Sequence, residues 1–220
     1  MPTSDFSSIE AIMHAVHCTK PRTICDIGIG CGKYGQLFRE CLDMDHGAEW
    51  HGSLYRGNLI VDGVEGYERY VTPIHRALYD RIFIGDIRAM AEQLENYDLF
   101  TMIDVIEHLS IEDGTRVLRT LQSKARLGVL VNAPIRPQPQ KTLLGNKLEE
   151  HISTWTAKDW RGFERARFRP IRDKWLVFLE GREGTAPAWL RMPRLRRRIK
   201  LAALRAFDAL WPGRLDVPFI

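Results

Sequence analysis

A glycine-rich run follows the first apolar segment of the chain and could bring its backbone close to a ligand. The run is Asp26-Ile-Gly28-Ile-Gly30-Cys-Gly32. Because glycine has no Cβ, Gly28, Gly30 and Gly32 can turn tightly and expose N–H groups to a nucleotide or another adenosine compound. The overlapping spacing Gly30-x-Gly32-x-x-Gly35 also fits the dinucleotide-binding fingerprint. The run alone therefore leaves two classes of ligand open.

Three acidic residues follow the ends of successive apolar runs. Asp26 closes the first run, Glu65 comes just after the second, and Asp86 follows the third. In an open parallel sheet the carboxyl ends of neighbouring strands border one crevice, so we expect these carboxylates to line a single pocket. Such a pocket suits a ligand that carries hydroxyl groups and a positive charge. In the alternative interpretation, Glu65 and Asp86 cap helices and Asp26 only orients the glycine run.

The elements that must position these residues alternate between short apolar runs and amphipathic stretches. This pattern predicts an α/β fold, with strands buried on both faces and helices covering them. The expected strands are residues 23–27, 59–64, 82–84, 99–103 and 128–131. The expected helices are residues 7–16, 34–42, 87–94 and 111–125, the last of which begins after Ser110.

The pattern changes after the fifth strand. A proline-containing connection runs from about residue 134 to 159, and loops of that length usually have a function. Two runs, 165–168 and 174–180, predict an antiparallel hairpin. Residues 182–188 have the composition of a linker, and residues 192–211 predict an amphipathic helix with clustered arginines. We therefore expect one domain over residues 1–181 and a basic helical tail over residues 182–220.

At this point the sequence resembles the class I S-adenosylmethionine-dependent methyltransferases, over residues 7–181. The D-x-G-x-G-x-G run, Glu65, the Gly85-Asp86 pair and the run Tyr97-Asp-Leu-Phe-Thr-Met-Ile-Asp-Val-Ile-Glu-His-Leu109 carry the resemblance. It implies a Rossmann-like, mostly parallel seven-stranded sheet that ends in an antiparallel hairpin, with helices on both faces. It also implies that S-adenosylmethionine is the cofactor.

The resemblance assigns roles to individual positions. It implies that Glu65 binds the ribose, that Asp86 and Ile87 hold the adenine, and that the glycine loop packs against the methionine part, near Asp26. The predicted cofactor-binding residues are these and the acid of the fourth motif, namely Asp26, Gly28, Gly30, Gly32, Glu65, Asp86, Ile87 and Asp104.

Methyl transfer mainly requires that nucleophile, methyl carbon and sulfur lie in line, and a base matters only where the acceptor still holds its proton. The predicted catalytic residues are His151, His108 and Asp104, with Glu107 as a further candidate base. Similar methyltransferases of small molecules often carry a histidine after the fifth strand, which favours His151. In the alternative interpretation, His151 braces a loop and His108 begins a helix.

The acceptor is predicted to be a hydroxyl of a small molecule, a glycan or a lipid-linked precursor. Methylation of adenine N6 in nucleic acid is disfavoured, because the run Asn132-Ala-Pro-Ile135 lacks the aromatic residue that stacks on a flipped base. RNA is a less favoured alternative acceptor, since the basic tail would bind phosphates without sequence preference. From Arg182 onward the sequence contains nine basic and three acidic residues, so the tail could bind an anionic membrane surface, a partner or its own domain. The sequence is also compatible with an oligomer.

Composition limits the class of protein and its expected location. The chain has 220 residues, 45% hydrophobic and 27% charged, which describes a globular protein. The N-terminus does not resemble a secretory signal, so we expect a cytoplasmic protein, with peripheral membrane contact only through the tail. The four cysteines form no C-x-x-C pair, so we expect free thiols and no metal site. The open alternatives are a nicotinamide-dependent oxidoreductase, in which the acid would follow Gly35 by thirty residues rather than about twenty, and a non-catalytic cofactor-binding module.

Overall fold

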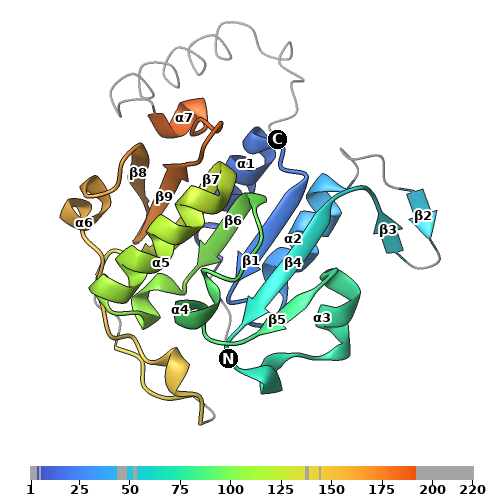
Figure 1. The fold of residues 1–220 in the computed structure, drawn as a ribbon, viewed down its shortest axis with the longest axis horizontal. Coiled ribbons are helices and arrows are strands. Elements are labelled where there is room, and N and C mark those ends of the chain that lie inside the picture. Colours follow the sequence, from blue (N-terminus) through green and yellow to red (C-terminus); the bar gives the residue numbers. More distant parts are fainter. Residues whose placement is uncertain are drawn as a thin grey trace, which may run out of the picture.

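The computed structural model describes Ser4 and residues 6–43, 49–51, 54–136, 139–143 and 145–191. Its centre is a seven-stranded sheet in the order β5-β4-β1-β6-β7-β9-β8 (Figure 1). The strands are β1 (Thr23–Ile27), β4 (Ile60–Glu65), β5 (Ile82–Ile84), β6 (Tyr97–Ile103), β7 (Ala125–Pro134), β8 (Ala166–Ile171) and β9 (Lys174–Glu180). The first five of these are parallel, and β9 runs antiparallel between β7 and β8. The predicted α/β sheet with a C-terminal antiparallel hairpin is confirmed.

Helices cover both faces of this sheet, as predicted. One face packs against α1 (Ile9–Thr19), α2 (Lys33–Leu42), α3 (Pro73–Leu78) and α7 (Ala188–Arg191). The other face packs against α4 (Ile87–Met90), α5 (Ile111–Lys124) and α6 (Ala157–Arg161). Figure 1 shows α5 in front of the sheet, with α1 and α2 behind it. The central strands supply side chains to both layers in alternation, which explains their nearly continuous apolar sequence.

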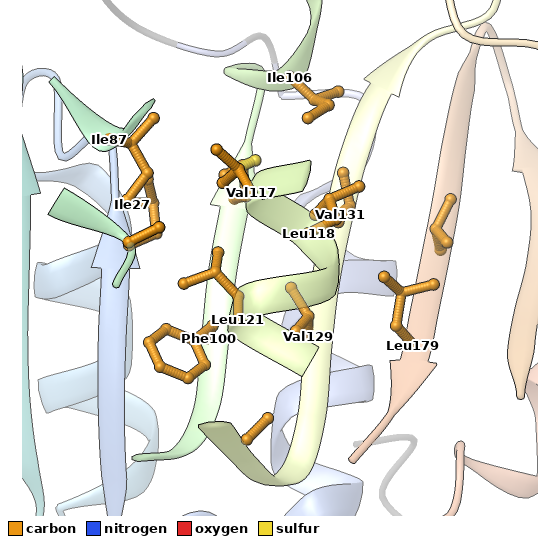
Figure 2. Packing of buried hydrophobic residues seen from close by; sticks show 14 of the residues in the cluster. Ile27, Ile87, Phe100, Ile106, Val117, Leu118, Leu121, Val129, Val131 and Leu179 are labelled. Atoms are coloured by element: carbon orange, nitrogen blue, oxygen red, sulfur yellow. The ribbon is translucent and has the colours of Figure 1, made fainter. Parts of the chain in front are cut away.

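Helix α5 shows how local sequence sets one of these contacts. It begins after Ser110, whose hydroxyl accepts a hydrogen bond from the Asp113 N–H at 3.0 Å. Val117, Leu118 and Leu121 then fall on one side of the helix and are fully buried over β6 and β7 (Figure 2). The expected capping serine and apolar face are both confirmed.

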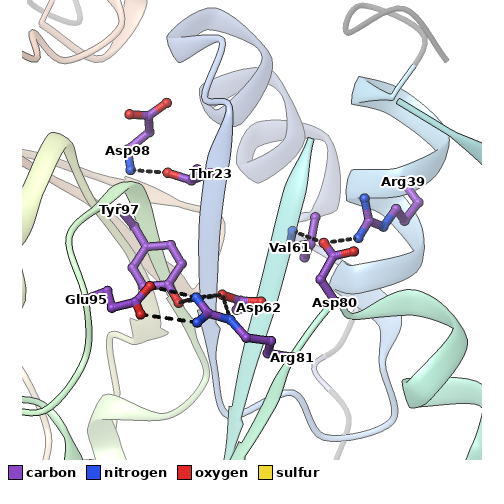
Figure 3. A network of polar contacts seen from close by, with 9 residues as sticks. All are labelled: Thr23, Arg39, Val61, Asp62, Asp80, Arg81, Glu95, Tyr97 and Asp98. Atoms are coloured by element: carbon purple, nitrogen blue, oxygen red, sulfur yellow. Dashed lines mark hydrogen bonds and ion pairs between the residues drawn. The ribbon is translucent and has the colours of Figure 1, made fainter. Parts of the chain in front are cut away.

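A polar network ties the amino-terminal halves of the parallel strands together (Figure 3). Arg81 binds the fully buried Asp62 carboxylate at 2.8 Å and also pairs with Glu95, while the Tyr97 hydroxyl donates to Asp62 at 2.5 Å. Arg81 lies just before β5, Asp62 in β4 and Tyr97 at the start of β6, so one network spans both sides of β1. Charge pairs thus fix the amino-terminal end of the parallel strands. The carboxyl ends of these strands, on the opposite side, are free to form a site.

Several elements differ from those expected. The short ribbon of β2 (Glu49–His51) and β3 (Leu54–Arg56), the 3-10 turns η2 (Glu68–Tyr70), η3 (Ile106–His108) and η4 (Lys147–Glu149), and helices α3, α6 and α7 were not predicted. Helix α4 spans one turn rather than the expected residues 87–94. Pro170, expected in the turn, lies inside β8, where an edge strand tolerates it.

The segment assigned to a linker packs on the body. Ala186 and Leu190 are buried in the same cluster as α1, and Arg165 donates to the carbonyl oxygens of Gly181 and Gly184 at 2.7 and 2.8 Å. Residues 182–191 therefore belong to the folded unit. The predicted helix over residues 192–211 lies outside the described residues. Among the helices in the described part of the chain, none combines the length and the apolar character that crossing a membrane would need.

Candidate functional site

A cavity of about 320 Å³ opens at the carboxyl ends of β1, β4, β5 and β6. The chain builds the sheet outward from β1 through β4 to β5, and then returns to add β6 on the other side of β1. The connections therefore diverge at this edge, and the crevice between them is where open α/β sheets bind ligands. The glycine loop, Glu65 and Asp86 line one part of the cavity, and Asp104, Glu107, His108 and His151 line another. The structure thus brings most of the predicted site residues together.

The peptide of Gly30 is held from both sides at the floor of the glycine loop. Its N–H donates to Glu65 Oε2 at 3.1 Å, and its carbonyl oxygen lies 2.9 Å from His75 Nε2. Thr72 N–H donates to His75 Nδ1 at 3.1 Å, so Nδ1 is an acceptor and the ring proton is on Nε2. His75 Nε2 therefore donates a hydrogen bond to the Gly30 carbonyl oxygen. Gly28 and Gly30 have φ of +76° and +52°, which favour glycine. The loop is therefore fixed before any ligand arrives.

Glu65 braces this loop and lines the cavity at the same time. Besides Gly30, it accepts a hydrogen bond from Tyr67 N–H at 2.9 Å through its other oxygen, and burial raises the pKa of its carboxyl. Each carboxylate oxygen can accept two hydrogen bonds, so both keep capacity for donors in the cavity. The side chain is positioned to receive a pair of hydroxyl groups.

Asp86 combines the two roles considered for it. Its Oδ1 accepts from Arg88 N–H at 2.9 Å and so caps α4, and its carboxylate also pairs with the Arg88 guanidinium, which lowers the pKa of the Asp86 carboxyl. The residue still lines the cavity, together with the buried Ile87 beside it. An ionised acceptor and an apolar side chain therefore stand at the same end of the cavity.

Asp26 corrects the expectation that three carboxylates line the pocket, because neither it nor Gly32 is among the residues that line the cavity. Thr101 donates to Asp26 Oδ1 at 2.7 Å and the Tyr79 hydroxyl donates to Oδ2 at 2.8 Å. Tyr79 in turn accepts from Gly35 N–H at 3.1 Å. Asp26 therefore acts on the loop from below, through Tyr79, and Gly32 serves as the residue before α2, with φ +80°.

Replacing Asp26 by Asn should change how stability depends on pH. Burial raises the pKa of the Asp26 carboxyl to about 7, although the hydrogen bonds from Thr101 and Tyr79 lower it. Between pH 4 and 7, roughly, the folded state holds a proton there that the unfolded state has lost. The free energy of unfolding should fall as pH rises through this window, by up to about 1.4 kcal/mol per pH unit from this group.

The variant Asp26→Asn removes that contribution, since an amide does not titrate. Urea unfolding of both proteins at a series of pH values isolates it as a difference. The stability of the variant relative to the wild type should increase with pH over the window. A difference that stays constant would show that Asp26 ionises normally in the folded protein.

At the other end of the cavity, Asp104 follows β6 in a left-handed conformation. Its φ is +53°, which aspartate adopts more readily than most residues. Its Oδ1 lies 2.8 Å from the Nζ of Lys174, the first residue of β9, which is buried and also lines the cavity. Strand β9 therefore supplies a cation to the carboxylate at the end of β6.

Glu107, His108 and His151 form a cluster next to this pair. One ligand atom from each lies within 4.8 Å of the others, and the two imidazole centroids are 4.7 Å apart. Glu107 is 3% exposed, and burial together with the Asp104 charge raises the pKa of its carboxyl to about 8. The sequence analysis expected no metal site from cysteine spacing, and the structure instead gathers a carboxylate and two imidazoles, which are themselves metal-binding groups.

Backbone contacts hold His151 beside His108. The Glu107 carbonyl oxygen accepts from the N–H groups of Ile152 and Ser153 at 3.0 and 3.1 Å, and His108 Nδ1 lies 3.2 Å from the Glu150 carbonyl oxygen. The part of the long connection around His151 thus lies against the turn after β6. Gln140, Asn146 and Leu148 from the same connection also line the cavity.

Trp155 and Trp160 pack the fold and do not line the cavity. Both are fully buried, and their rings stack with centroids 4.6 Å apart. Trp155 Nε1 donates to the Ile106 carbonyl oxygen at 3.3 Å, which anchors the end of the long connection beneath η3.

The sequence analysis missed three residues that shape the site, namely His75, Tyr79 and Lys174. The Thr72-Pro73 pair before His75 is a helix-start signal that could have located α3, on which His75 lies, with Tyr79 just after it. No local signal joins Lys174 to Asp104, because the two are seventy residues apart and meet only when β9 enters the sheet beside β7.

Comparison with known proteins supports the fold. No family model and no curated protein matches the chain. The N-terminal domain of EvdMO1 with SAH bound is similar with a TM-score of 0.57 and 11% identity, covering 82% of each chain. Human N-acetylserotonin methyltransferase in complex with SAM is similar with a TM-score of 0.54 and 14% identity, covering 80% of this chain and 52% of that one, so this chain spans about half of it.

The methyltransferase domain of bacterial Hen1 has a TM-score of 0.50 and 16% identity, and the match covers 79% of this chain and 97% of that one. Two of these three structures are of methyltransferases, the EvdMO1 domain has SAH bound, and all three share little sequence with the chain. A likeness at such low sequence identity shows a shared fold. The chain has the class I S-adenosylmethionine-dependent methyltransferase fold.

Proposed function

We propose that this protein is an S-adenosylmethionine-dependent methyltransferase that transfers the methyl group to a hydroxyl of a small-molecule acceptor. The observation that supports this proposal most is that one cavity contains both groups suited to binding the cofactor and groups that could accept a proton from a hydroxyl. The first end has the glycine loop, Glu65 and Asp86, and the second has Glu107, His108 and His151.

The residues of the first end fit this cofactor. Glu65 offers acceptors for the two ribose hydroxyls, Asp86 offers one for the adenine amino group, and Ile87 an apolar surface for the ring. A Cβ on Gly28 would lie 2.4 Å from Val105 Cγ2, so the loop leaves no room for a side chain where the methionine part would pass. Gly30 and Asp104 complete the proposed contacts, while Asp26 and Gly32 act by shaping the loop.

The chemistry needs few groups. The acceptor oxygen attacks the methyl carbon, the carbon–sulfur bond breaks with its electron pair going to sulfur, and S-adenosylhomocysteine leaves. A hydroxyl must also lose its proton, and the residues we propose to act on it are His151 and His108, together with Glu107. Asp104, held by Lys174 at 2.8 Å, would fix this end of the cavity. A glycan or lipid-linked precursor remains a prediction within this acceptor class.

Two measurements test the proposal. Calorimetric titration should show S-adenosylhomocysteine binding in the micromolar range and no comparable binding of NAD. Transfer of labelled methyl from S-adenosylmethionine to a panel of hydroxyl-bearing small molecules should then find an acceptor. Binding of NAD instead would support the oxidoreductase alternative, whereas cofactor binding without transfer to any acceptor would support a non-catalytic module.

Replacing Glu65 by Ala should weaken S-adenosylhomocysteine binding by about 5- to 150-fold, because loss of the charge-assisted contact with the ribose should cost roughly 1–3 kcal/mol in total. Glu65→Gln should lose less, since the amide oxygen still accepts. Glu68→Gln is the matched control, because Glu68 is exposed in η2 and does not line the cavity. Equal affinities for the wild type and Glu65→Ala would exclude Glu65 as the ribose ligand.

A further inference from the structure

The Glu107, His108 and His151 cluster contains a buried carboxyl oxygen, Glu107 Oε2, that lacks a hydrogen-bond partner within the described residues. Buried carboxylates are normally paired with a cation or a set of donors, because burial without a partner is costly. The Nζ of Lys174, a nearby buried cation, lies 2.8 Å from the neighbouring Asp104 Oδ1. Glu107 Oε2 is therefore an acceptor that a ligand in the cavity could occupy.

The two histidines that share the cluster are arranged as ligands. The Glu150 carbonyl oxygen can only accept, so His108 Nδ1, 3.2 Å away, carries the proton and donates it. His108 Nε2 is then left with a free lone pair. A ring N–H donated to a backbone carbonyl is the usual way in which a protein orients a metal-binding histidine. His151 is brought alongside by the backbone bonds at Ile152 and Ser153, so its place does not depend on a ligand.

We propose that Glu107, His108 and His151 bind one divalent transition-metal cation at the acceptor end of the cavity. Their ligand atoms lie within 4.8 Å of one another. Two ligands of one cation are at most about 4.4 Å apart, since each bond is about 2.0–2.2 Å long, so small side-chain rotations would close the site. Two imidazoles and one carboxylate favour zinc, iron, cobalt or manganese over magnesium or calcium, which prefer oxygen ligands. Three protein ligands leave coordination positions open toward the cavity, which all three residues line.

This site deepens the proposed function and rests on it. An acceptor hydroxyl bound to the cation becomes more acidic, and its proton can leave to water through the cavity opening. The resulting oxygen anion attacks the methyl carbon while the carbon–sulfur electron pair goes to sulfur. His108 and His151 would then promote loss of the hydroxyl proton through the cation that they bind, in place of accepting the proton themselves, and the cation would hold the acceptor oxygen in place.

The test is cation binding by the full chain, which needs neither acceptor nor activity. After removal of metals with a chelator, the wild type should bind Co²⁺ and Zn²⁺ at one site by calorimetry, and Co²⁺ should show visible absorption typical of nitrogen ligands. His151→Ala and Glu107→Gln should each lower this affinity by at least about 100-fold, since even outer partners of metal ligands are worth about 10- to 100-fold. His14→Ala, an exposed histidine on α1, should bind as the wild type does.

S-adenosylhomocysteine binding, measured on the same samples, serves as the control for folding and separates the two proposals. Every variant should bind it within about threefold of the wild type, because none of the changed residues is assigned to the cofactor. Cofactor binding without cation binding would overturn the metal site and leave the proposed function standing. Cation binding that His151→Ala does not weaken would place the cation elsewhere and would also overturn the site. Cation binding without cofactor binding would instead overturn the proposed function.

Discussion

Replacing Gly28 by Ala should lower the affinity for S-adenosylhomocysteine by about 100-fold or more. Gly28 has φ +76°, which costs an L-residue roughly 1–2 kcal/mol, and its new Cβ would lie 2.4 Å from Val105 Cγ2. Relief of such a contact typically costs a further 1–3 kcal/mol or moves the backbone. Val105 itself lines the cavity, so either response displaces cofactor-binding groups. Calorimetric titration of the variant measures the effect directly.

Gly145→Ala is the matched control for backbone strain. Gly145 has φ +81°, nearly the same as Gly28, yet among the described residues other than its chain neighbours no atom lies within 4 Å of where its Cβ would be. This variant should lose about 1 kcal/mol of stability and bind the cofactor within about fivefold of the wild type. If both variants bind equally, close packing against Val105 is not what makes Gly28 necessary.

Replacing Trp160 by Ala should lower the free energy of unfolding by about 3–5 kcal/mol. The side chain is fully buried and stacks on Trp155 with centroids 4.6 Å apart, so truncation leaves a large cavity between α6 and the sheet. Urea unfolding followed by far-ultraviolet circular dichroism measures the loss. The cofactor affinity of the folded variant should change far less, since Trp160 does not line the cavity.

Trp160→Phe separates packing from hydrogen bonding in the same position. The Trp160 Nε1 atom is buried and has no hydrogen-bond partner among the described residues, so phenylalanine removes an unsatisfied donor as well as some ring volume. Its cost should stay below about 1.5 kcal/mol, and Trp155→Phe should cost more, because Trp155 Nε1 donates to Ile106 at 3.3 Å. The opposite ranking of the two phenylalanine variants would show that hydrogen bonding does not distinguish these tryptophans.

The sheet and the cofactor end of the cavity were largely predictable because their signals are local. Five short apolar runs marked the parallel strands, and an acid at or just after the ends of β1, β4 and β5 marked the edge where they converge. The prediction that Asp26 lines the cavity was wrong, because the side chain of an acid near the end of a buried strand can lie on either face of the sheet. Its side chain is held by Thr101 and Tyr79 below the loop.

The acceptor end was only partly predictable, because its geometry depends on contacts between distant segments. His108 and His151 were chosen separately from sequence, and nothing in the spacing of forty-three residues indicates that their rings lie 4.7 Å apart. The same holds for Asp104 and Lys174. The short helices α3, α6 and α7 have four to six residues each, too few to show a periodic apolar pattern, and they form because tertiary contacts support them.

The attachment of the long connection has a consequence for how such proteins diversify. The groups at the β6 turn and in the connection that fix this segment are largely main-chain atoms, such as the Ile106, Glu107 and Glu150 carbonyl oxygens. Main-chain bonds do not depend on side-chain identity, so residues between 139 and 150 can change while the segment stays in place. The strands of the cofactor end, β1, β4 and β5, lie outside this segment, but Leu148 and Glu149 lie near Gly66 and Glu65 at that end and would have to be kept. Evolution, or a designer grafting a different segment, could therefore alter acceptor choice without rebuilding the cofactor site.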